Sequence, residues 1–266
     1  MIDETLLRLD VFLRKNGHFK SRQQAREAIL NGCVWVDGKP AEKPSQLCAE
    51  TVSVLIAENV MPYVSRGGLK LKKAIDMFGI NMTGEVAMDI GASTGGFTDC
   101  MLKNGVSMVY AVDVGSDQLD PELQKDARVI SMENTDIRRV QKYDFLDVTF
   151  ISVDVSFISL ALIIPKISEL LSQEGRAVCL VKPQFEAGRR NVGKNGLVKK
   201  KSVHVSVIKN ILNLCTQHGL YACELTFSPI KGGSGNIEYL LYIKKGFLKR
   251  DVDVDGVVAA AHRELI

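Results

Sequence analysis

Four charged residues stand at positions where they could meet at one edge of a sheet. Asp154 ends one predicted buried strand, and Lys182 ends the next. Glu238 lies in the last predicted strand, and Lys70 lies on a predicted helix just beside its apolar stripe. Charged residues at the ends of buried strands need an ionic partner or a function, whereas Lys70 alone equally fits a solvated helical lysine. The pattern predicts a polar site of two lysines and two carboxylates.

A glycine-rich turn lies between a predicted strand over residues 85–90 and a predicted helix over residues 98–104. Glycine allows a tight bend and the close approach of a ligand. Asp113 ends the next predicted strand, where a carboxylate can accept both hydroxyls of an adenosyl ribose. The spacing departs from G-x-G-x-x-G and therefore favours S-adenosylmethionine over NAD, with a turn that binds no ligand as the alternative. The predicted cofactor residues are Asp89, Gly91, Ser93, Thr94, Gly95, Gly96, Phe97, Asp113 and Asp136. Asp136 equally fits a simple helix cap.

This set of residues suits methyl transfer to a ribose hydroxyl. Such a hydroxyl is almost fully protonated at neutral pH, so it needs a base within reach and an in-line approach to the methyl group. Lys182 is the candidate base, but a lysine with a pKa near ~10.4 needs burial or a second cation to favour its neutral form. Lys70 is the candidate second cation, and Asp154 and Glu238 are expected to orient the lysines. Whether Asp154 steers Lys182 or only balances its charge stays open. No metal is required.

Strands and helices alternate through the second part of the chain. This order predicts an α/β fold with a mostly parallel, doubly wound sheet and ligands at the carboxyl ends of the strands. The predicted strands cover residues 85–90, 107–114, 129–132, 148–155, 177–181, 221–227 and 237–243, and the last two can pair antiparallel. Besides the helix over 98–104, predicted helices cover residues 157–171 and 202–217.

The first 61 residues predict a small α+β unit. Apolar residues from Leu6 to Leu13 recur at helical spacing, and a second helix opens with a capping-box pattern at Ser21. The pair Asp37-Gly38 follows a short apolar run and predicts a two-residue hairpin, and residues 52–56 predict a further strand. The unit is too small to hold an active-site cleft, so we expect it to bind a partner.

Basic residues are distributed unevenly, although 34 Lys and Arg against 31 Asp and Glu give a net charge of only +3. Residues 11–26 and residues 187–223 each contain several cations and no acid. Each segment alone fits a solvated face, but two of them favour a polyanionic partner such as RNA. The predicted RNA-binding residues are Arg14, Lys20, Arg22, Arg26, Arg66, Arg189 and Arg190.

The composition disfavours secretion, membrane insertion and zinc binding. The longest apolar stretch, residues 155–164, is far shorter than the ~20 residues that a membrane span needs. The acidic start lacks the pattern of a signal peptide. Six scattered cysteines without a Cys-x-x-Cys pair fit reduced thiols, and the four histidines show no metal-ligand spacing. We therefore expect a cytoplasmic protein without a metal site.

Motifs in the first unit resemble the alpha-L RNA-binding motif of a small-subunit ribosomal protein, pseudouridine synthases and tyrosyl-tRNA synthetases. The matching stretches are Arg8-Leu9-Asp10, Ser21-Arg22-Gln23-Gln24-Ala25 and Val34-Trp35-Val36-Asp37-Gly38-Lys39. The resemblance implies docking on structured RNA through the helix that carries Arg22 and Arg26. A small helical domain that contacts another protein is the alternative.

The second part of the chain carries four further motifs, Ser65–Leu71, Asp89–Asp99, Asp154–Ser159 and Val181–Glu186. They are similar to the TlyA family, which joins an alpha-L module to an FtsJ/RrmJ-like methyltransferase domain. The similarity covers residues ~5 to ~245 and implies domains over residues 1–61 and 62–266, the second with a seven-stranded Rossmann-like sheet. The family's Lys-Asp-Lys-Glu set falls on Lys70, Asp154, Lys182 and Glu238. The resemblance implies S-adenosylmethionine-dependent 2′-O-methylation of cytidine in ribosomal RNA or ribosomal subunits. The tail after Lys245 lies outside it.

Two other classes of function stay open. Members of this family are also called haemolysins, which would make the protein membrane-active; the lack of a signal peptide and of a spanning segment disfavours this. The second class is an RNA-binding ribosome assembly factor that catalyses no reaction. The presence of all four charged residues of the predicted site disfavours it. The sequence does not predict the oligomeric state, the modified nucleotide or the ribosomal subunit.

Overall fold

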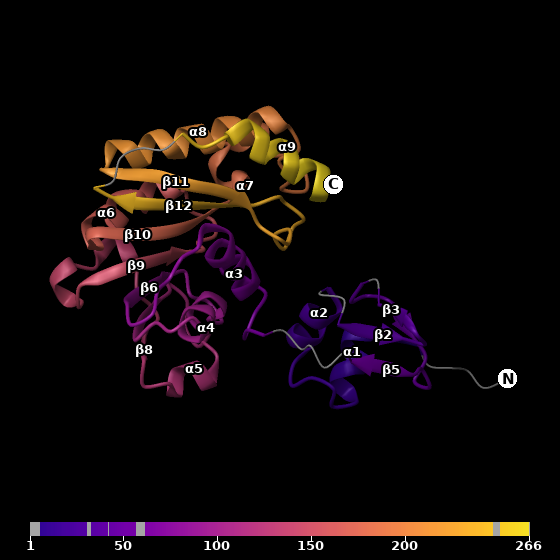
Figure 1. Ribbon diagram of the computed structural model, residues 1–266. Helices are drawn as coiled ribbons and strands as arrows, with labels where there is room; N and C mark the ends of the chain where they lie inside the picture. Colours follow the sequence, from indigo (N-terminus) through magenta and orange to yellow (C-terminus); the bar gives the residue numbers. More distant parts are fainter. Residues whose placement is uncertain (1–5, 31–32, 42, 57–61, 247–250, 266) are drawn as a thin grey trace. The chain divides into compact units, whose positions relative to one another are not determined.

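The structure is a computed structural model, and it describes residues 6–30, 33–41, 43–56, 62–246 and 251–265. The chain divides into two compact units, Met1–Arg66 and Gly67–Ile266 (Figure 1). The boundary predicted after residue 61 adjoins residues 57–61, which lie outside the described residues.

The small unit packs two helices with short strands around a core of its own. Its helices are α1 (Leu9–Lys15) and α2 (Arg22–Leu30). Its strands are β1 (Leu7–Arg8), β2 (Val34–Val36), β3 (Lys39–Pro40), β4 (Leu47–Cys48) and β5 (Val54–Ile56). The strands form a sheet of order β3-β2-β5 and a separate β1-β4 pair. The core combines α1, α2 and β2 through Leu9, Leu13, Ala25, Ile29 and Val34.

The small unit confirms the predicted hairpin and corrects one helix boundary. Asp37 and Gly38 have φ of 49° and 75°, the left-handed backbone that a two-residue hairpin between β2 and β3 requires. Helix α1 begins at Leu9 and not near Leu6, because Leu7 pairs with Cys48 in the β1-β4 ladder and this fixes the preceding backbone as strand.

The large unit is built on a seven-stranded sheet of order β11-β12-β10-β9-β6-β7-β8. The strands are β6 (Val86–Ile90), β7 (Met108–Val112), β8 (Val129–Met132), β9 (Val148–Val153), β10 (Leu171–Val181), β11 (Leu220–Phe227) and β12 (Tyr239–Lys245). From β10 to β8 neighbouring strands are parallel, and β12 is antiparallel to both β10 and β11. The order reverses between β6 and β9, which is where a doubly wound sheet binds its ligand.

Helices cover both faces of this sheet (Figure 1). They are α3 (Gly67–Phe78), α4 (Gly96–Lys103), α5 (Pro121–Lys125), α6 (Ile164–Leu170), α7 (Pro183–Glu186), α8 (Lys201–Gln217) and α9 (Val254–Leu265). Short 3₁₀ helices are η1 (Ile137–Arg139), η2 (Lys142–Asp144), η3 (Leu160–Leu162) and η4 (Arg189–Asn191). Helices α6, α8 and α9 pack on the face that carries Met88 and Ile90 of β6. Asp89 points to the opposite face, since side chains alternate along a strand.

The tail after Lys245 contains α9, a helix that we did not predict. Its residues Val254, Val258 and Ala261 are buried in the same core as α8 and β11. The spacing of these residues places them on one helical face. The tail therefore completes the hydrophobic core of the large unit.

The helix predicted over residues 157–171 is wrong in its first half. The structure has η3 followed by α6, which begins at Ile164, and Phe157 has a left-handed φ of 64°. Pro165 stands in the first turn of α6, where its missing N–H leaves no hydrogen bond unmade; in the interior of a longer helix it would break one. Strand β10 also begins at Leu171, six residues earlier than predicted, with an irregular pairing to β9 before Arg176.

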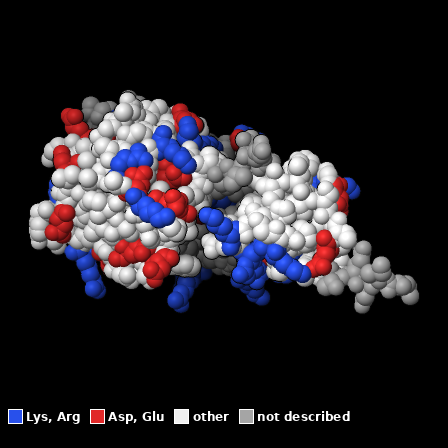
Figure 2. Space-filling view, turned by 90° about the horizontal axis from the view of Figure 1, so that it is seen from below, with Lys and Arg blue, Asp and Glu red and all other residues white. Residues whose placement is uncertain are grey.

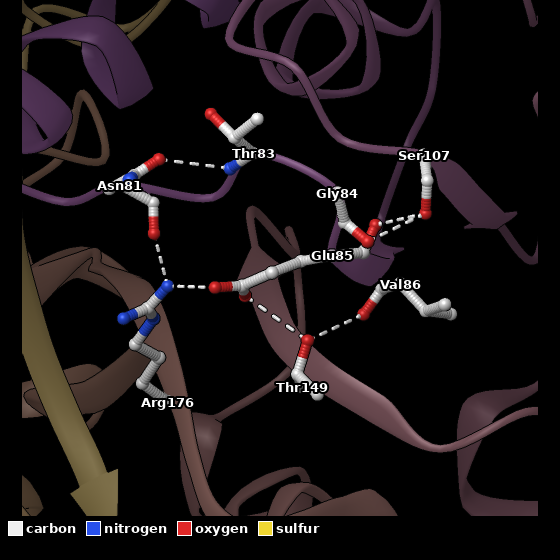
Figure 3. Close-up of polar contacts among 8 residues, drawn as sticks. All are labelled: Asn81, Thr83, Gly84, Glu85, Val86, Ser107, Thr149 and Arg176. Atoms are coloured by element: carbon white, nitrogen blue, oxygen red, sulfur yellow. Dashed lines mark hydrogen bonds and ion pairs between the residues drawn. The ribbon is translucent and has the colours of Figure 1, made fainter.

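A polar cluster ties three strands of the large sheet together (Figure 3). Arg176 of β10 contacts both the Glu85 carboxylate and the Asn81 carbonyl oxygen. The Thr149 hydroxyl of β9 donates to Glu85 at 3.1 Å, and the Ser107 hydroxyl donates to the Glu85 carbonyl oxygen at 2.8 Å. The cluster thereby fixes β6, β9 and β10 relative to one another.

Candidate active site

Three of the four predicted charged residues meet around the amine of Lys70. Its Nζ donates to Glu238 Oε2 at 2.7 Å and lies 3.8 Å from Asp154 Oδ2. The Lys70 and Glu238 residues are only 9% and 2% exposed, so the ion pair is shielded from water. A buried carboxylate requires such a partner.

Lys182 completes the set from the other side of Asp154. Its Nζ lies 2.5 Å from Asp154 Oδ1 and donates to the Ser156 hydroxyl at 2.9 Å. The two oxygens of Asp154 thus each face one lysine, and the charges alternate in the order Glu238, Lys70, Asp154, Lys182. The predicted meeting of an amine and an acid on adjoining strand ends is found. Ser156 lay within a matching motif, but the sequence did not single it out as a site residue.

The sheet explains why residues so distant in the sequence converge. Asp154 and Lys182 directly follow the parallel strands β9 and β10, so both stand at the same edge. Glu238 directly precedes β12 and is not within it as predicted. Because β12 runs antiparallel to β10, with Tyr239 opposite Val181, its beginning lies at that same edge.

Two glycines make room for this convergence. A Cβ on Gly91 would lie 2.6 Å from the Asp154 carbonyl oxygen, and Gly91 has a φ of 84°. A Cβ on Gly232 would lie 2.3 Å from Glu238 Oε1. Larger residues at these positions would displace the end of β9 or the Glu238 carboxylate.

Asp89 lies beneath the glycine-rich turn and has no exposed surface. Thr98 of α4 donates to Asp89 Oδ2 at 2.7 Å, and Ser152 of β9 donates to Oδ1 at 2.9 Å. Burial raises the pKa of Asp89 to about 7; the two hydroxyls oppose this rise, and the nearby Asp154 adds to it. In this arrangement Asp89 joins β6 to α4 and β9, and its carboxylate faces protein atoms.

Asp89 should make stability fall as pH rises. Its carboxyl group ionises near pH ~3.9 in the unfolded chain and near 7 in the folded one, so its contribution is complete below pH ~4 and is lost as pH rises through about 7. Between pH 5 and pH 8 the unfolding free energy of the wild type should fall about 2–3 kcal/mol further than that of Asp89→Asn. Urea unfolding of both proteins at the two pH values measures this difference. Equal losses in the two proteins would contradict the assignment.

Asp113 follows β7 at the next position along the same edge. It is half-buried, and its oxygens accept the backbone N–H groups of Ser93 at 2.8 Å and Gly115 at 2.7 Å. A carboxylate has about four acceptor positions, so two of them stay available for hydroxyl groups. This arrangement fits the ribose of an adenosyl cofactor, held beside a glycine turn in which Gly91 and Gly95 have φ of 84° and 93°.

The loop that follows Asp113 is held by a residue that sequence reasoning missed. Glu133 accepts the backbone N–H groups of Asp117, Gln118 and Leu119 at 3.0, 2.7 and 3.1 Å. These bonds, led by those from Gln118 and Leu119, lower the pKa of Glu133. The hydroxyl of Ser93, in the glycine turn, also donates to Gln118 at 3.1 Å. No spacing rule predicts the contacts of Glu133, because the loop that it holds contains Asp117 in a left-handed backbone conformation, with a φ of 54°.

The other predicted cofactor residues have different surroundings. Ser93 is exposed and Thr94 half-buried, whereas Gly95, Gly96 and Phe97 are buried. Phe97 is 3% exposed and contributes to the protein interior. Asp136 caps η1 by accepting the backbone N–H of Arg138 at 3.0 Å, and its ion pair with the Arg138 side chain lowers its pKa to about 2. The alternative role as a helix cap is therefore present, and contact with an adenine stays a prediction.

An exposed aromatic residue stands beside the charged network. Phe157 is 92% exposed, and its ring lies 5.2 Å from that of Phe185, centroid to centroid. The Lys182 Nζ lies 5.9 Å from the centre of the Phe185 ring. A bulky residue with a φ of 64° is strained, and such strain is typical of functional sites. Glu186 holds this loop by accepting from the Ser159 hydroxyl and the Leu160 N–H.

The predicted RNA-binding residues are mostly exposed. In the small unit these are Arg14, Lys20, Arg22 and Arg26, and in the large unit Arg189 and Arg190 of η4. Arg66 is half-buried at the end of the small unit. On the displayed face, blue side chains gather at one place on the small unit, while red and blue alternate on the large one (Figure 2).

Arg22 has a structural role in addition to its exposure. Its guanidinium donates to Asp10 at 3.0 Å, and Arg8 donates to both oxygens of the same carboxylate. Asp10 is fully buried, which favours its neutral form, but the two arginines outweigh burial and lower its pKa. Replacing Arg22 would therefore disturb the fold of the small unit. Among the described residues, Arg26 makes no such contact with Asp10.

A doubly wound sheet of this order, with a glycine turn after β6 and a carboxylate after β7 at its carboxyl edge, is typical of the class of Rossmann-like methyltransferases. The profile of the FtsJ-like methyltransferases matches residues 63–245, and that of the S4 domain matches residues 7–51. The chain belongs to the FtsJ-like methyltransferase family, in its TlyA branch with an S4 domain in front.

Named relatives cover nearly the whole chain. The 16S/23S rRNA (cytidine-2′-O)-methyltransferase TlyA of Mycobacterium tuberculosis is 36% identical over 97% of this chain and 97% of its own length. Hemolysin A of Brachyspira hyodysenteriae is 41% identical over 89% of this chain and 99% of its own. A solved structure of a hemolysin candidate from Streptococcus thermophilus is 42% identical, with a TM-score of 0.77 over 97% of this chain and 96% of that one.

Two structural findings bear on the other predicted properties. Among the described residues, no helix combines the length and the apolar character that crossing a bilayer requires. The described residues also hold no group of three or more His, Cys, Asp or Glu side chains placed to bind a metal ion.

Proposed function

We propose that the protein transfers a methyl group from S-adenosylmethionine to the 2′-hydroxyl of a cytidine in ribosomal RNA. The observation that carries the proposal is the alternating chain Glu238, Lys70, Asp154 and Lys182 at the carboxyl edge of the sheet. The relative from M. tuberculosis, which bears that activity in its name, supports the choice of substrate. Because ribosomal RNA is the substrate, the proposed site of action is the cytoplasm.

Lys182 is the proposed base. The hydroxyl of the target ribose has to lose its proton as its oxygen attacks, and a base within hydrogen-bond reach accelerates this step. Asp154 and Ser156 hold the Lys182 amine from two sides and so fix where it points. Lys70, anchored by Glu238, holds the second oxygen of Asp154 and is the proposed orienting cation.

The proposed cofactor site uses the residues of the glycine turn and Asp113. S-adenosylmethionine supplies an electrophilic methyl group when it is bound. Asp113 would accept the hydroxyls of its ribose, while the amide of Ser93 holds the carboxylate in place. Asp89 supports the turn from below through Thr98.

Phe157 is the proposed stacking surface for the target base or its neighbour. Enzymes that modify a nucleotide take it out of the helical stack, and an exposed aromatic ring can hold the base. Phe157→Ala should raise the RNA concentration for half-maximal methylation roughly 5- to 150-fold, the equivalent of ~1–3 kcal/mol per stacked base. Steady-state kinetics with varied RNA measure this. Tyr143→Ala is the control, since Tyr143 is 84% exposed on η2; equal behaviour of both variants would reject the role.

The S4 domain is proposed to dock on structured RNA through α2 and the loop before it. Lys20→Gln combined with Arg26→Gln should make the slope of log affinity against log salt less negative by about 2, because binding releases about one counterion fewer for each phosphate contact that is lost. Arg22 is left intact because it neutralises the buried Asp10. Affinity for S-adenosylmethionine should not change. A filter-binding salt series tests this, and an unchanged slope would exclude this surface.

Methyl transfer to ribosomal subunits from cells that lack this protein tests the proposed function. Wild-type protein with radiolabelled S-adenosylmethionine should label one or both subunits. An assembly factor without turnover would bind subunits and leave them unlabelled. A membrane-active protein would release dye from liposomes at physiological salt, and equal release by Lys182→Ala would separate that activity from the charged network.

A further inference from the structure

A pocket that the proposed mechanism does not use lies in the basic segment of the large unit. It has a volume of about 420 Å³, in the size range of ligand sites. Four cations and no acidic residue line it. The four cations are Arg190, Lys194, Lys199 and Lys200.

The wall of this pocket is a preformed turn. The Gly193 N–H donates to the Leu197 carbonyl oxygen at 2.9 Å, and the Gly196 N–H donates to the Gly193 carbonyl oxygen at 2.9 Å. Gly196 has the left-handed φ of 72° that this turn requires. The turn therefore fixes the backbone that carries Lys194 and that joins Arg190 to Lys199 and Lys200.

Helix α8 adds positive potential to the same place. It begins at Lys201, its first turn contains no acidic residue, and no side chain caps it at Lys200. The N-terminal end of a helix of this length attracts anions. The potential of the helix and the cations that line the pocket thus favour the same kind of ligand, a negatively charged group.

The pocket is also tied to Glu238, the residue that anchors Lys70. Asn236, two residues before it, is 2% exposed; it accepts the Val198 N–H at 3.0 Å and donates to the Gly196 carbonyl oxygen at 2.8 Å. His204 of α8 lies 2.8 Å from the Val198 carbonyl oxygen and 2.7 Å from the hydroxyl of Tyr239, the residue after Glu238. Buried bonds on both sides of Glu238 fix the pocket relative to the charged network.

We propose that this pocket binds a backbone phosphate of the substrate RNA and sets the register of the strand at the active site. The inference rests on the proposed function and adds a site to it. A phosphodiester contact carries no sequence information, but it positions the strand. A site braced against Glu238 can do so for the nucleotide to be methylated, whereas a cation on a mobile side chain contributes mainly affinity.

The test neutralises two exposed lysines of the pocket. In Lys199→Gln/Lys200→Gln, the slope of log RNA affinity against log salt should become less negative by about 1 to 2, with affinity for S-adenosylmethionine unchanged. Lys209→Gln is the matched control, because Lys209 is an exposed lysine of the same basic segment on α8, is paired with Asp255 and does not line the pocket. Its slope should equal that of the wild type. If the slope is unchanged in the double variant while the wild-type protein methylates RNA, the inference is overturned and the proposed function still stands.

Two further measurements test whether the phosphate belongs to RNA or to a free compound, and whether Asn236 positions the pocket. If the pocket served a free phosphate compound, inorganic pyrophosphate would bind to the wild type in calorimetry and not to the double variant, while the RNA slope stayed unchanged; this would overturn the proposal.

Asn236→Ala should lower the methylation rate at saturating RNA and leave RNA affinity nearly intact, as expected for a positioning residue. An unaltered rate would overturn the bracing. Absence of methylation by the wild type would instead reject the proposed function.

Discussion

Lys182→Met is expected to reduce methyl transfer by about 10²- to 10⁴-fold, the contribution typical of a general base. Methionine keeps the length of the side chain and removes only the amine that contacts Asp154 and Ser156. Asp154 still faces Lys70, so the network does not lose its last cation. Single-turnover rates at saturating RNA and cofactor measure the loss.

Lys72→Met is the control for this experiment. Lys72 lies on α3 and forms an exposed ion pair with Asp76 that has no part in the proposed site. Its rate should equal that of the wild type. Binding of RNA and S-adenosylmethionine should be retained in both variants, so a loss that came only from weaker binding would contradict the role of Lys182 as base.

Lys70→Met is expected to lower the free energy of unfolding by about 3–5 kcal/mol, because it leaves the carboxylate of Glu238 buried without its cation. Lys103→Met removes a surface pair with Asp99, in which the lysine side chain is 53% exposed, and should cost less than about 1 kcal/mol. Urea unfolding of the two variants gives the comparison.

The double variant Lys70→Met/Glu238→Gln isolates the ion pair. Removing the charge along with its partner should restore part of the stability, since a neutral amide is easier to bury than an unpaired carboxylate. Methyl transfer should stay low in this variant, because the orienting cation is still absent. If the double variant is as unstable as the sum of the single ones, the two residues do not stabilise each other.

Much of the site could be predicted because the strands determine it. Asp154 and Lys182 follow adjacent parallel strands, and an antiparallel last strand brings Glu238 to the same edge. The helix over residues 202–217 and all seven strands of the large sheet were likewise recognisable from apolar periodicity and appear in the structure. Pro165 indicates that the helix begins at Ile164 and not at residue 157, because proline is common in the first turn of a helix.

The parts that could not be predicted depend on loop conformation. Lys182 contacts Ser156, and Glu133 accepts three backbone N–H groups, in loops that contain non-glycine residues with left-handed backbone, including Phe157, Asn134 and Asp117. Asn236 braces a turn almost forty residues away in the sequence, through two buried hydrogen bonds. Neither periodicity nor motif spacing encodes these contacts, since they follow from tertiary packing. The same holds for Arg22, whose partner Asp10 lies on another helix.

The chemical position of the transferred methyl group tests the central claim most directly. Ribosomal RNA labelled by the wild-type protein can be hydrolysed completely with alkali, which cleaves the chain at every nucleotide with a free 2′-hydroxyl. Because Lys182 and its partners are proposed to deprotonate a ribose hydroxyl, the label should appear in alkali-resistant dinucleotides. Label in mononucleotides would mean that a base is methylated, and would contradict the role assigned to Lys70, Asp154, Lys182 and Glu238.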